Sequence, residues 1–258
     1  MYFFFKFLYS LQIPFLKRLI PSLIKRIFFF NKTQIIRLNF GKIKLNLLQS
    51  IDRQIYLTGF YEKEQLVFLD QICKKNKITH FLDIGANIGY YSLYLKKINN
   101  IYAFEPNKKN FLRLQENCEL NNLSIKLYNF GLSNSNSESE IWYTDKDKMG
   151  GSAIFDKNDL ELRKYNPKNI IKERIKIKRL DELLDIKNKK ILVKIDVERH
   201  EKKVLEGMSK LIKQNDIILQ IEIGEQNKNE VFNYLKKIQL SWINTIRHDH
   251  YFVKNIVE

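Results

Sequence analysis

Carboxylates and glycines that follow short apolar runs are the residues of this chain best suited to bind a ligand. Along the chain they are Asp83, Gly85, Asn87, Gly89 and Glu105. The two glycines would let a ligand approach the backbone closely, and Asp83 could orient the loop or a cationic ligand group. A carboxylate at the position of Glu105 can accept hydrogen bonds from both hydroxyls of a ribose. The pattern therefore predicts a site for an adenosine.

The spacing of the glycines argues against a dinucleotide. The fingerprint G-x-G-x-x-G, counted from Gly85, needs glycines where the chain has Asn87 and Tyr90, so we do not expect a pyrophosphate on this turn. Adenosine without a pyrophosphate points to S-adenosylmethionine as the cofactor. The alternative is that Glu105 only caps the helix that follows, with Pro106 in its first turn.

A second group of polar residues follows a later apolar run, KILVKID. Carboxylates and an imidazole at the end of a strand suit a reaction in which a proton is removed from an acceptor group and that acceptor is held in place. We expect His200 to be the general base, because its ordinary pKa is about 6.5, and Asp196 and Glu198 to orient the acceptor or bind a metal. Glu222 could join Asp196 around Mg²⁺, which prefers carboxylates and waters. Lys194 lies within the apolar run and is expected to extend toward solvent or to pair with a neighbouring carboxylate.

Three further features have weaker signals. Asn129 and Gly131 follow another apolar run, where topology would place the adenine of the cofactor. The glycines of residues 149–152 could be hinges of a lid over the acceptor or part of a surface loop. His248 and His250 are expected to be exposed residues of a late strand.

Alternating apolar runs and amphipathic stretches give the elements that position these residues. Strands are predicted over residues 79–84, 101–105, 125–132, 189–196 and 217–223, and helices over 65–75, 90–97, 108–121, 201–214 and 229–237. Strands separated by helices pair in parallel with right-handed crossovers. We therefore expect a doubly wound, mostly parallel α/β sheet, whose ligands bind beyond the carboxyl ends of the strands.

The first fifty residues differ from the rest. Nine Lys or Arg residues precede the first acid, Asp52, and supply more than half of the formal net charge of +16. Cations mixed with Phe, Leu and Ile are typical of a segment on an anionic membrane surface. The alternative is a helical layer packed on the domain or on a second subunit. Pro14 and Pro21 are expected to break it into short helices.

Neither a membrane span nor an export signal is predicted in this segment. Its longest uncharged run, residues 7–16, is shorter than the roughly 18 residues that a span needs. Its start is apolar, and no small-residue cleavage site follows. Two cysteines among 258 residues are too few for a disulfide framework. The predicted location is the cytoplasm, with contact to the inner face of the membrane as an option.

Several motifs together resemble the FkbM family of S-adenosylmethionine-dependent methyltransferases. They are FLDIGANIGYYSLYL, AFEPNKKNFLRLQENCELNNL, GLSN, RLDELL and KIDVERHEKKVLEGM, in order over roughly residues 52–225. The resemblance implies a class I methyltransferase domain over residues 51–258, preceded by the basic, aromatic segment 1–50. It also implies methyl transfer to oxygen, in many members on sugars of polysaccharides or glycolipids. One departure is Arg199, where the family usually has a glycine.

Three functions remain open at this stage. The first is methylation of a sugar or glycan hydroxyl, on an acceptor that could be phosphate- or lipid-linked. The second is nucleic-acid methylation, favoured by the net charge but lacking a Pro-Pro-Tyr/Phe motif after the fourth strand, so no specific nucleic acid is expected. The third is a non-catalytic module attached to a membrane. A homo-oligomer is compatible with all three.

Overall fold

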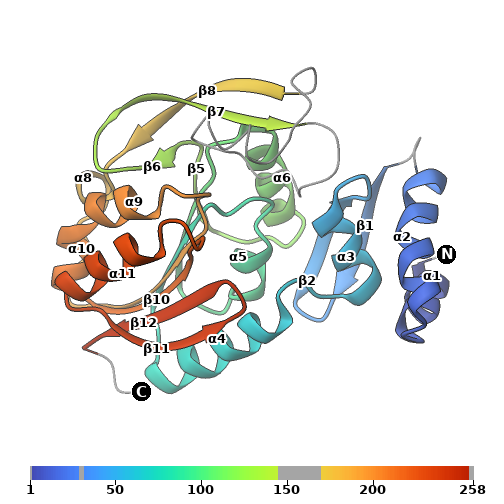
Figure 1. Ribbon diagram of the computed structural model, residues 1–258, viewed down its shortest axis with the longest axis horizontal. Helices are drawn as coiled ribbons and strands as arrows, with labels where there is room; N and C mark the ends of the chain where they lie inside the picture. Colours follow the sequence, from blue (N-terminus) through green and yellow to red (C-terminus); the bar gives the residue numbers. More distant parts are fainter. Residues whose placement is uncertain (1, 29–31, 145–169, 256–258) are drawn as a thin grey trace.

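A seven-stranded sheet forms the centre of the molecule (Figure 1). The structure, a computed structural model, describes residues 2–28, 32–144 and 170–255. The strands, in the order in which they lie side by side, are β11 (Ser241–Ile246), β12 (Asp249–Lys254), β10 (Asp216–Glu222), β9 (Lys190–Ile195), β3 (His80–Ile84), β4 (Asn100–Phe104) and β5 (Lys126–Tyr128). From β10 to β5 all neighbours pair in parallel, and only β12 runs antiparallel to its neighbours, β10 and β11. The predicted doubly wound, mostly parallel sheet is confirmed.

Helices cover both faces of this sheet because its strands are apolar on both sides. Phe81 and Leu192 face one helical layer, and their neighbours Leu82 and Val193 face the other. The first layer contains α4 (Lys63–Asn76) and α5 (Tyr90–Tyr94), and α6 (Lys108–Glu119) lies beside it on β4. The second layer contains α8 (Leu180–Leu183), α9 (Glu201–Gly207), α10 (Ser209–Gln214) and α11 (Lys228–Lys237). Such alternation fixes the register of each strand.

Two predicted elements are divided in the structure. The strand expected over 125–132 leaves the central sheet after Tyr128, because the Asn129 side chain donates hydrogen bonds to the carbonyls of Glu105 and Pro106 (2.9 and 3.1 Å). The chain then enters a second sheet, made of β6 (Gly131–Leu132), β8 (Ile170–Lys178) and β7 (Ser137–Thr144). The helix expected over 201–214 is interrupted at Met208, between α9 and α10. The expected lid, residues 149–152, lies outside the described residues.

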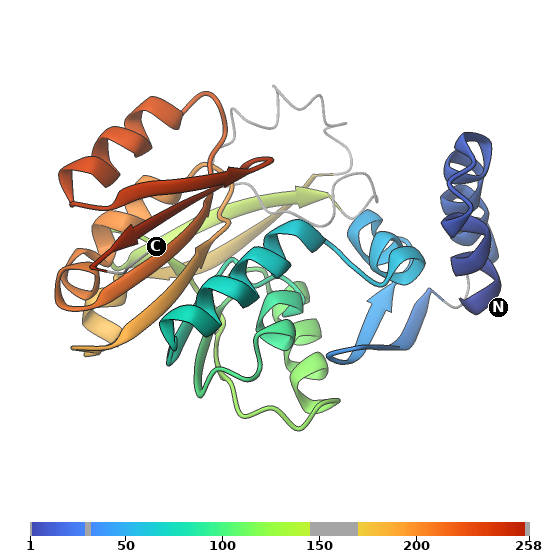
Figure 2. The ribbon, with the colours of Figure 1, turned by 90° about the horizontal axis from the view of Figure 1, so that it is seen from below.

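The N-terminal segment forms two helices and a hairpin on one side of the molecule (Figure 2). They are α1 (Tyr2–Ser10), α2 (Pro14–Ile27), β1 (Thr33–Leu38) and β2 (Gly41–Asn46), followed by α3 (Ser50–Thr58). Pro14 opens α2 as expected, but Pro21 lies inside this helix and does not end it. Phe5, Ile20 and Ile24 belong to the same buried cluster as Phe81 of the central sheet. The inner face of the segment is therefore packed on the domain.

No helix among the described residues has both the length and the apolar character needed to span a bilayer.

Candidate functional site

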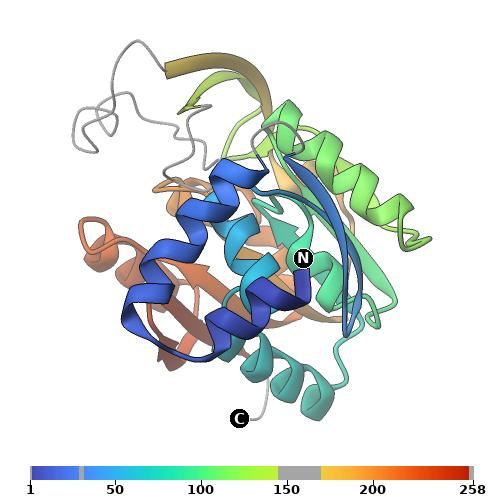
Figure 3. The same ribbon diagram turned by 90° about the vertical axis from the view of Figure 1, so that its right-hand side faces the viewer.

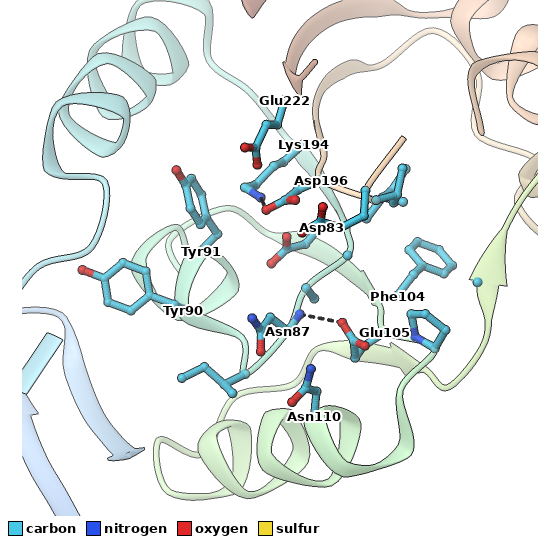
Figure 4. A pocket seen from close by; sticks show the side chains of 18 of the residues that line it. Asp83, Asn87, Tyr90, Tyr91, Phe104, Glu105, Asn110, Lys194, Asp196 and Glu222 are labelled. Atoms are coloured by element: carbon cyan, nitrogen blue, oxygen red, sulfur yellow. Dashed lines mark hydrogen bonds and ion pairs between the residues drawn. The ribbon is translucent and has the colours of Figure 1, made fainter. Parts of the chain in front are cut away.

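A cavity of about 270 Å³ lies at the carboxyl ends of β3, β4 and β9 (Figure 4). The chain passes from β3 to one side of the sheet and later returns to add β9 on the other side, so the cavity marks the topological switch point. Eight of the residues predicted from the sequence line it: Asp83, Gly85, Asn87, Glu105, Gly131, Asp196, Glu198 and Glu222. The strand-end rule thus predicts the edge of the sheet at which this cavity lies.

Gly85 allows the ends of β3 and β9 to meet at this cavity. Its φ is +82°, and a Cβ there would overlap the backbone carbonyl of Asp196. The Asp196 amide in turn donates to the carbonyl of Ile84 at 3.0 Å. Gly89, also at positive φ, starts α5 beside Leu114 and is not among the lining residues. The first glycine shapes the cavity, whereas the second shapes the packing behind it.

Glu105 is a buried carboxylate that faces the cavity with hydrogen-bonding capacity left over. Oε2 accepts the backbone N–H of Asn87 at 2.8 Å and Oε1 that of Asn107 at 2.9 Å. Burial raises the pKa of Glu105 to about 7 despite these two bonds. Asn107 is the residue whose side chain caps α6, through the amide of Asn110 at 3.0 Å. An ionised carboxylate accepts about four hydrogen bonds, so two positions remain for a ligand.

Lys194 lies at the centre of the acidic part of the cavity. Its side chain is buried, and Nζ donates to Asp196 Oδ2 at 3.0 Å and lies 4.7 Å from the centre of the Tyr91 ring. Of the two expectations for Lys194, pairing with a neighbouring carboxylate is confirmed, and the carboxylate is that of Asp196. Asp83 is buried next to them, where its Oδ2 accepts from the amide and hydroxyl of Ser92 at 3.1 and 2.6 Å.

The charges around Lys194 shift the titration of the whole group. Burial opposes the ammonium charge, but the carboxylates of Asp196, Glu62 and Asp83 raise the pKa of Lys194 above its ordinary value. Burial, reinforced by the nearby Asp196 charge, raises the pKa of Glu222 to about 9. At neutral pH Glu222 is therefore protonated and able to donate a hydrogen bond, while Lys194 is charged.

The arrangement does not favour the magnesium site expected at Asp196 and Glu222. The cation that neutralises Asp196 is the ammonium of Lys194, which lies 3.0 Å from Asp196 Oδ2. The described part of the chain also contains no group of three or more His, Cys, Asp or Glu residues placed to hold a metal ion.

His200 and Asn129 do not line the cavity, contrary to expectation. The His200 Nε2 lies 3.0 Å from Ser133 Oγ, and burial, with a contribution from Lys203, lowers the pKa of the imidazole to about 4. Such a group is a weak base, so the structure does not favour His200 as the general base. Asn129 uses its amide to hold the backbone after β4.

A late-strand histidine was also placed wrongly. His248 is exposed as expected, but His250 is buried in β12, where its Nδ1 lies 2.8 Å from Thr245 Oγ1. The error has a simple cause: helices cover both faces of β12, since Phe68 of α4 packs on Tyr251 and Phe232 of α11 packs on His250.

A buried polar network behind the cavity was not anticipated. The Gln220 amide donates to Asp249 Oδ1 at 2.7 Å and to the Tyr91 hydroxyl at 3.3 Å, and that hydroxyl donates to Glu62 Oε2 at 2.6 Å. These residues come from β10, β12, α5 and the start of α4. The one local signal was a glutamine in the apolar run IILQIEI. The network supports Lys194 and Tyr91 from the side away from the cavity.

The residues present fit S-adenosylmethionine by their chemistry. The two remaining acceptor positions of Glu105 match the two hydroxyls of a ribose. The lining includes five acidic side chains and one basic side chain, which favours a cationic ligand such as a sulfonium. Phe104, Phe130 and Leu132 add apolar surface on which a base can lie.

Comparison with known proteins gives a family. The model of the FkbM methyltransferase domain matches residues 83–251. Hexuronic acid methyltransferase AglP of Haloferax volcanii is 28% identical to this chain over 175 residues, which are 66% of this chain and 67% of that protein.

Solved structures were compared as well. The FkbM methyltransferase of Methylobacillus flagellatus aligns with 14% identity and a TM-score of 0.49, over 78% of this chain. This chain spans only 52% of that structure's length. The tRNA (uracil-54, C5)-methyltransferase of Pyrococcus abyssi, solved with S-adenosyl-L-homocysteine, aligns with 12% identity and a TM-score of 0.44, over 86% of this chain and 43% of its own.

Proposed function

The chain belongs to the FkbM methyltransferase family, and we propose that it transfers the methyl group of S-adenosylmethionine to a hydroxyl group of a sugar. The observation that carries this proposal is the placement of Glu105, Asp196 and Lys194 around one cavity at the switch point of the sheet. One carboxylate is available for a ribose, and a second, held by an ammonium, is available for an acceptor hydroxyl.

Residues of the first two strand ends would hold the cofactor. Glu105 would accept hydrogen bonds from the ribose hydroxyls, and the loop from Gly85 to Asn87 would lie against the ligand. When bound, S-adenosylmethionine supplies an electrophilic methyl group. The carboxylate of Asp196, directly after β9, would stabilise the positive charge next to it.

Asp196 takes the role first assigned to His200 in this proposal. Its carboxylate lines the cavity and is partly exposed, whereas Lys194 on the same strand holds one of its oxygens. The other oxygen can accept the proton of an acceptor hydroxyl and so orient that hydroxyl for attack. Glu222, protonated at neutral pH, can donate a hydrogen bond to a second acceptor oxygen, and Glu198 lies on the same wall.

A sugar suits this lining better than a nucleic acid does. Sugar hydroxyls donate hydrogen bonds to carboxylates, and tyrosines such as Tyr61 and Tyr90 offer flat apolar surface. A phosphodiester backbone would be repelled by the acidic wall, whatever the net charge of the chain elsewhere. The name of the Haloferax volcanii relative, a hexuronic acid methyltransferase, points in the same direction. This scheme includes acceptor sugars attached to a phosphate or to a lipid carrier.

The proposal is tested by methyl transfer from radiolabelled S-adenosylmethionine to a panel of acceptors. The panel contains neutral hexosides, hexuronic acid glycosides, tRNA and single-stranded DNA. We expect transfer to a sugar, reduced at least roughly a hundredfold in Asp196→Asn, since general base catalysis contributes about 10²–10⁴. Asp185→Asn, which alters an exposed carboxylate outside the cavity, is the matched control. Transfer to nucleic acid alone would contradict the proposal, as would binding of S-adenosylmethionine without transfer to any acceptor.

A further inference from the structure

The helices α1 and α2 carry apolar side chains both toward the domain and toward solvent. The inner face, with Phe5, Ile20 and Ile24, is buried against the domain. The outer face is exposed, and it holds Phe3, Phe4, Phe7, Leu11, Ile13, Phe15, Leu19, Leu23 and Ile27. These are nine of the 14 large hydrophobic residues exposed in the described parts of the chain. In Figure 3 the ribbons of α1 and α2 lie in front of the other described elements.

The exposure is too large to be incidental. Phe3 is 80% exposed, Phe15 68% and Phe7 61%. On α2 the exposed residues Phe15, Leu19 and Leu23 follow one another at intervals of four, so they form a continuous stripe. A contiguous apolar stripe on a solvent-exposed face marks an interaction site.

The charges beside the stripe are all of one sign. Lys17, Arg18, Lys25 and Arg26 are exposed on α2, and Lys6 lies on α1. Residues 1–51 contain nine Lys or Arg residues and no acid. The surface therefore combines apolar insertion with cationic flanks, the pattern of helices that lie in the interface of an anionic bilayer.

We propose that the outer face of α1 and α2 binds the surface of an anionic lipid bilayer. Aromatic and aliphatic side chains enter the boundary of the acyl chains, while the Lys and Arg side chains contact the lipid head groups. A second copy of the chain is a poorer occupant, because a symmetric contact brings the same patch to both sides. It would place cations against cations with no acid in the segment to neutralise them.

One helix, α3, contacts both the N-terminal helices and the cavity. Tyr2 of α1 and Phe28 both pack their rings against Tyr56 of α3, with centroids 4.9 and 6.0 Å apart. The same helix α3 contributes Ile51 to the cavity wall. A bilayer on the outer face would therefore bring the cavity near acceptors carried by lipids.

The experiment is sedimentation of the full-length protein with vesicles. We expect binding to vesicles of phosphatidylcholine mixed with phosphatidylglycerol, and much weaker binding to phosphatidylcholine alone. Binding should weaken roughly tenfold for each change in Phe7→Ser and Phe15→Ser, from the apolar surface lost. It should weaken about fivefold for each change in Arg18→Gln and Arg26→Gln, and also in high salt.

Matched controls lie on other elements. Leu112→Ser and Val67→Ser remove apolar side chains that are 48% and 43% exposed away from the helices, and these changes should leave vesicle binding unaltered. All of these side chains are exposed, so each variant should keep the wild-type unfolding temperature. Equal binding of wild type and both Phe variants would overturn the proposal. So would a dimer in solution that is lost in the Phe variants while no vesicle binds, since the occupant would then be a second copy.

Discussion

The carboxyl group of Glu105 should make cofactor binding depend on pH. Burial raises the pKa of this group to about 7, so it changes from mostly protonated to mostly ionised between pH 6 and pH 8. The ionised form accepts the stronger hydrogen bonds. We expect the affinity for S-adenosylmethionine to rise about tenfold over this interval, because the ionised fraction of Glu105 rises from about one tenth at pH 6 to about nine tenths at pH 8.

Calorimetric titration of wild type and Glu105→Gln at both pH values measures this effect. The variant should bind roughly ten- to a hundredfold more weakly at pH 8, in line with a hydrogen bond to a charged group. Any titration of the ligand itself remains in the variant, so only the difference between the two proteins is assigned to Glu105. An equal pH dependence in both would mean that Glu105 does not contact the ligand.

Arg199 holds a backbone conformation that suits glycine. Its φ is +73°, directly after Glu198 at +51°. A left-handed conformation costs a residue with a side chain roughly 1–2 kcal/mol, a cost that glycine avoids. We expect Arg199→Gly to be more stable than Arg199→Ala by about 1 kcal/mol in urea unfolding. Both variants lose the arginine side chain, so their comparison isolates the backbone, and equal stability would show that the loop relaxes without strain.

At the scale of the element, Gly85 decides how β3 and β9 meet. An alanine there would place its Cβ on the Asp196 carbonyl and would have to adopt a φ of +82°. Overlap with backbone cannot be relieved by a rotamer change, so β9 would have to shift. We expect Gly85→Ala to lower the free energy of unfolding by about 3 kcal/mol or more and to abolish cofactor binding.

Gly224→Ala is the matched control for this change. Gly224 follows the neighbouring strand β10, and a Cβ there would meet Asn227 Oδ1 at an ordinary 3.6 Å. Thermal unfolding of both variants by circular dichroism should therefore show a large shift for the first and a small one for the second. Similar shifts would mean that the strand ends adapt to a side chain at either position.

The sequence was sufficient to predict those elements that follow one simple pattern of apolar residues. Strands such as β3 and β9 are uninterrupted apolar runs, and ligands bind at their carboxyl ends, so the cavity and eight of its residues could be predicted. The strand β8 was missed although its alternating RIKIK is typical of a strand with one covered face. His200 could not be placed because its pairing with Ser133 joins residues 67 positions apart. The buried network of Gln220 and Asp249 depends in the same way on contacts between distant segments.

At the scale of the whole molecule, positive and negative charge are separated. The N-terminal helices and hairpin contain only cations before Asp52, while the cavity is lined by five acids and one lysine. The net charge of +16 therefore describes the outer surface and gives no information about the ligand of the cavity. An inference from net charge alone would have favoured a nucleic acid.

Buried carboxyl groups also determine how the stability of the whole molecule changes with pH. The pKa of Glu222 is about 9 in the folded protein, against about 4.3 in an unfolded chain. A group whose pKa is higher in the folded protein than in the unfolded chain stabilises the fold. This stabilisation is complete below the unfolded pKa and is lost as the pH rises through the folded pKa. Glu105 and Glu201 have pKa values of about 7, so the stabilisation that they contribute is largely lost by pH 8. Lys194, whose pKa is also raised, keeps its contribution throughout this interval.

The unfolding temperature without cofactor should therefore fall between pH 7 and pH 9, with Glu222 as the main carboxyl group still titrating. One proton changes the free energy of unfolding by at most about 1.4 kcal/mol per pH unit. Glu222→Gln cannot ionise, so its unfolding temperature should change much less over this interval. Glu225→Gln, an exposed carboxylate three residues further on, should follow the wild type. If the unfolding temperatures of wild type and Glu222→Gln changed in parallel with pH, the pKa of Glu222 would lie below 7. Glu222 would then be a carboxylate when an acceptor enters the cavity, able to accept hydrogen bonds but not to donate them.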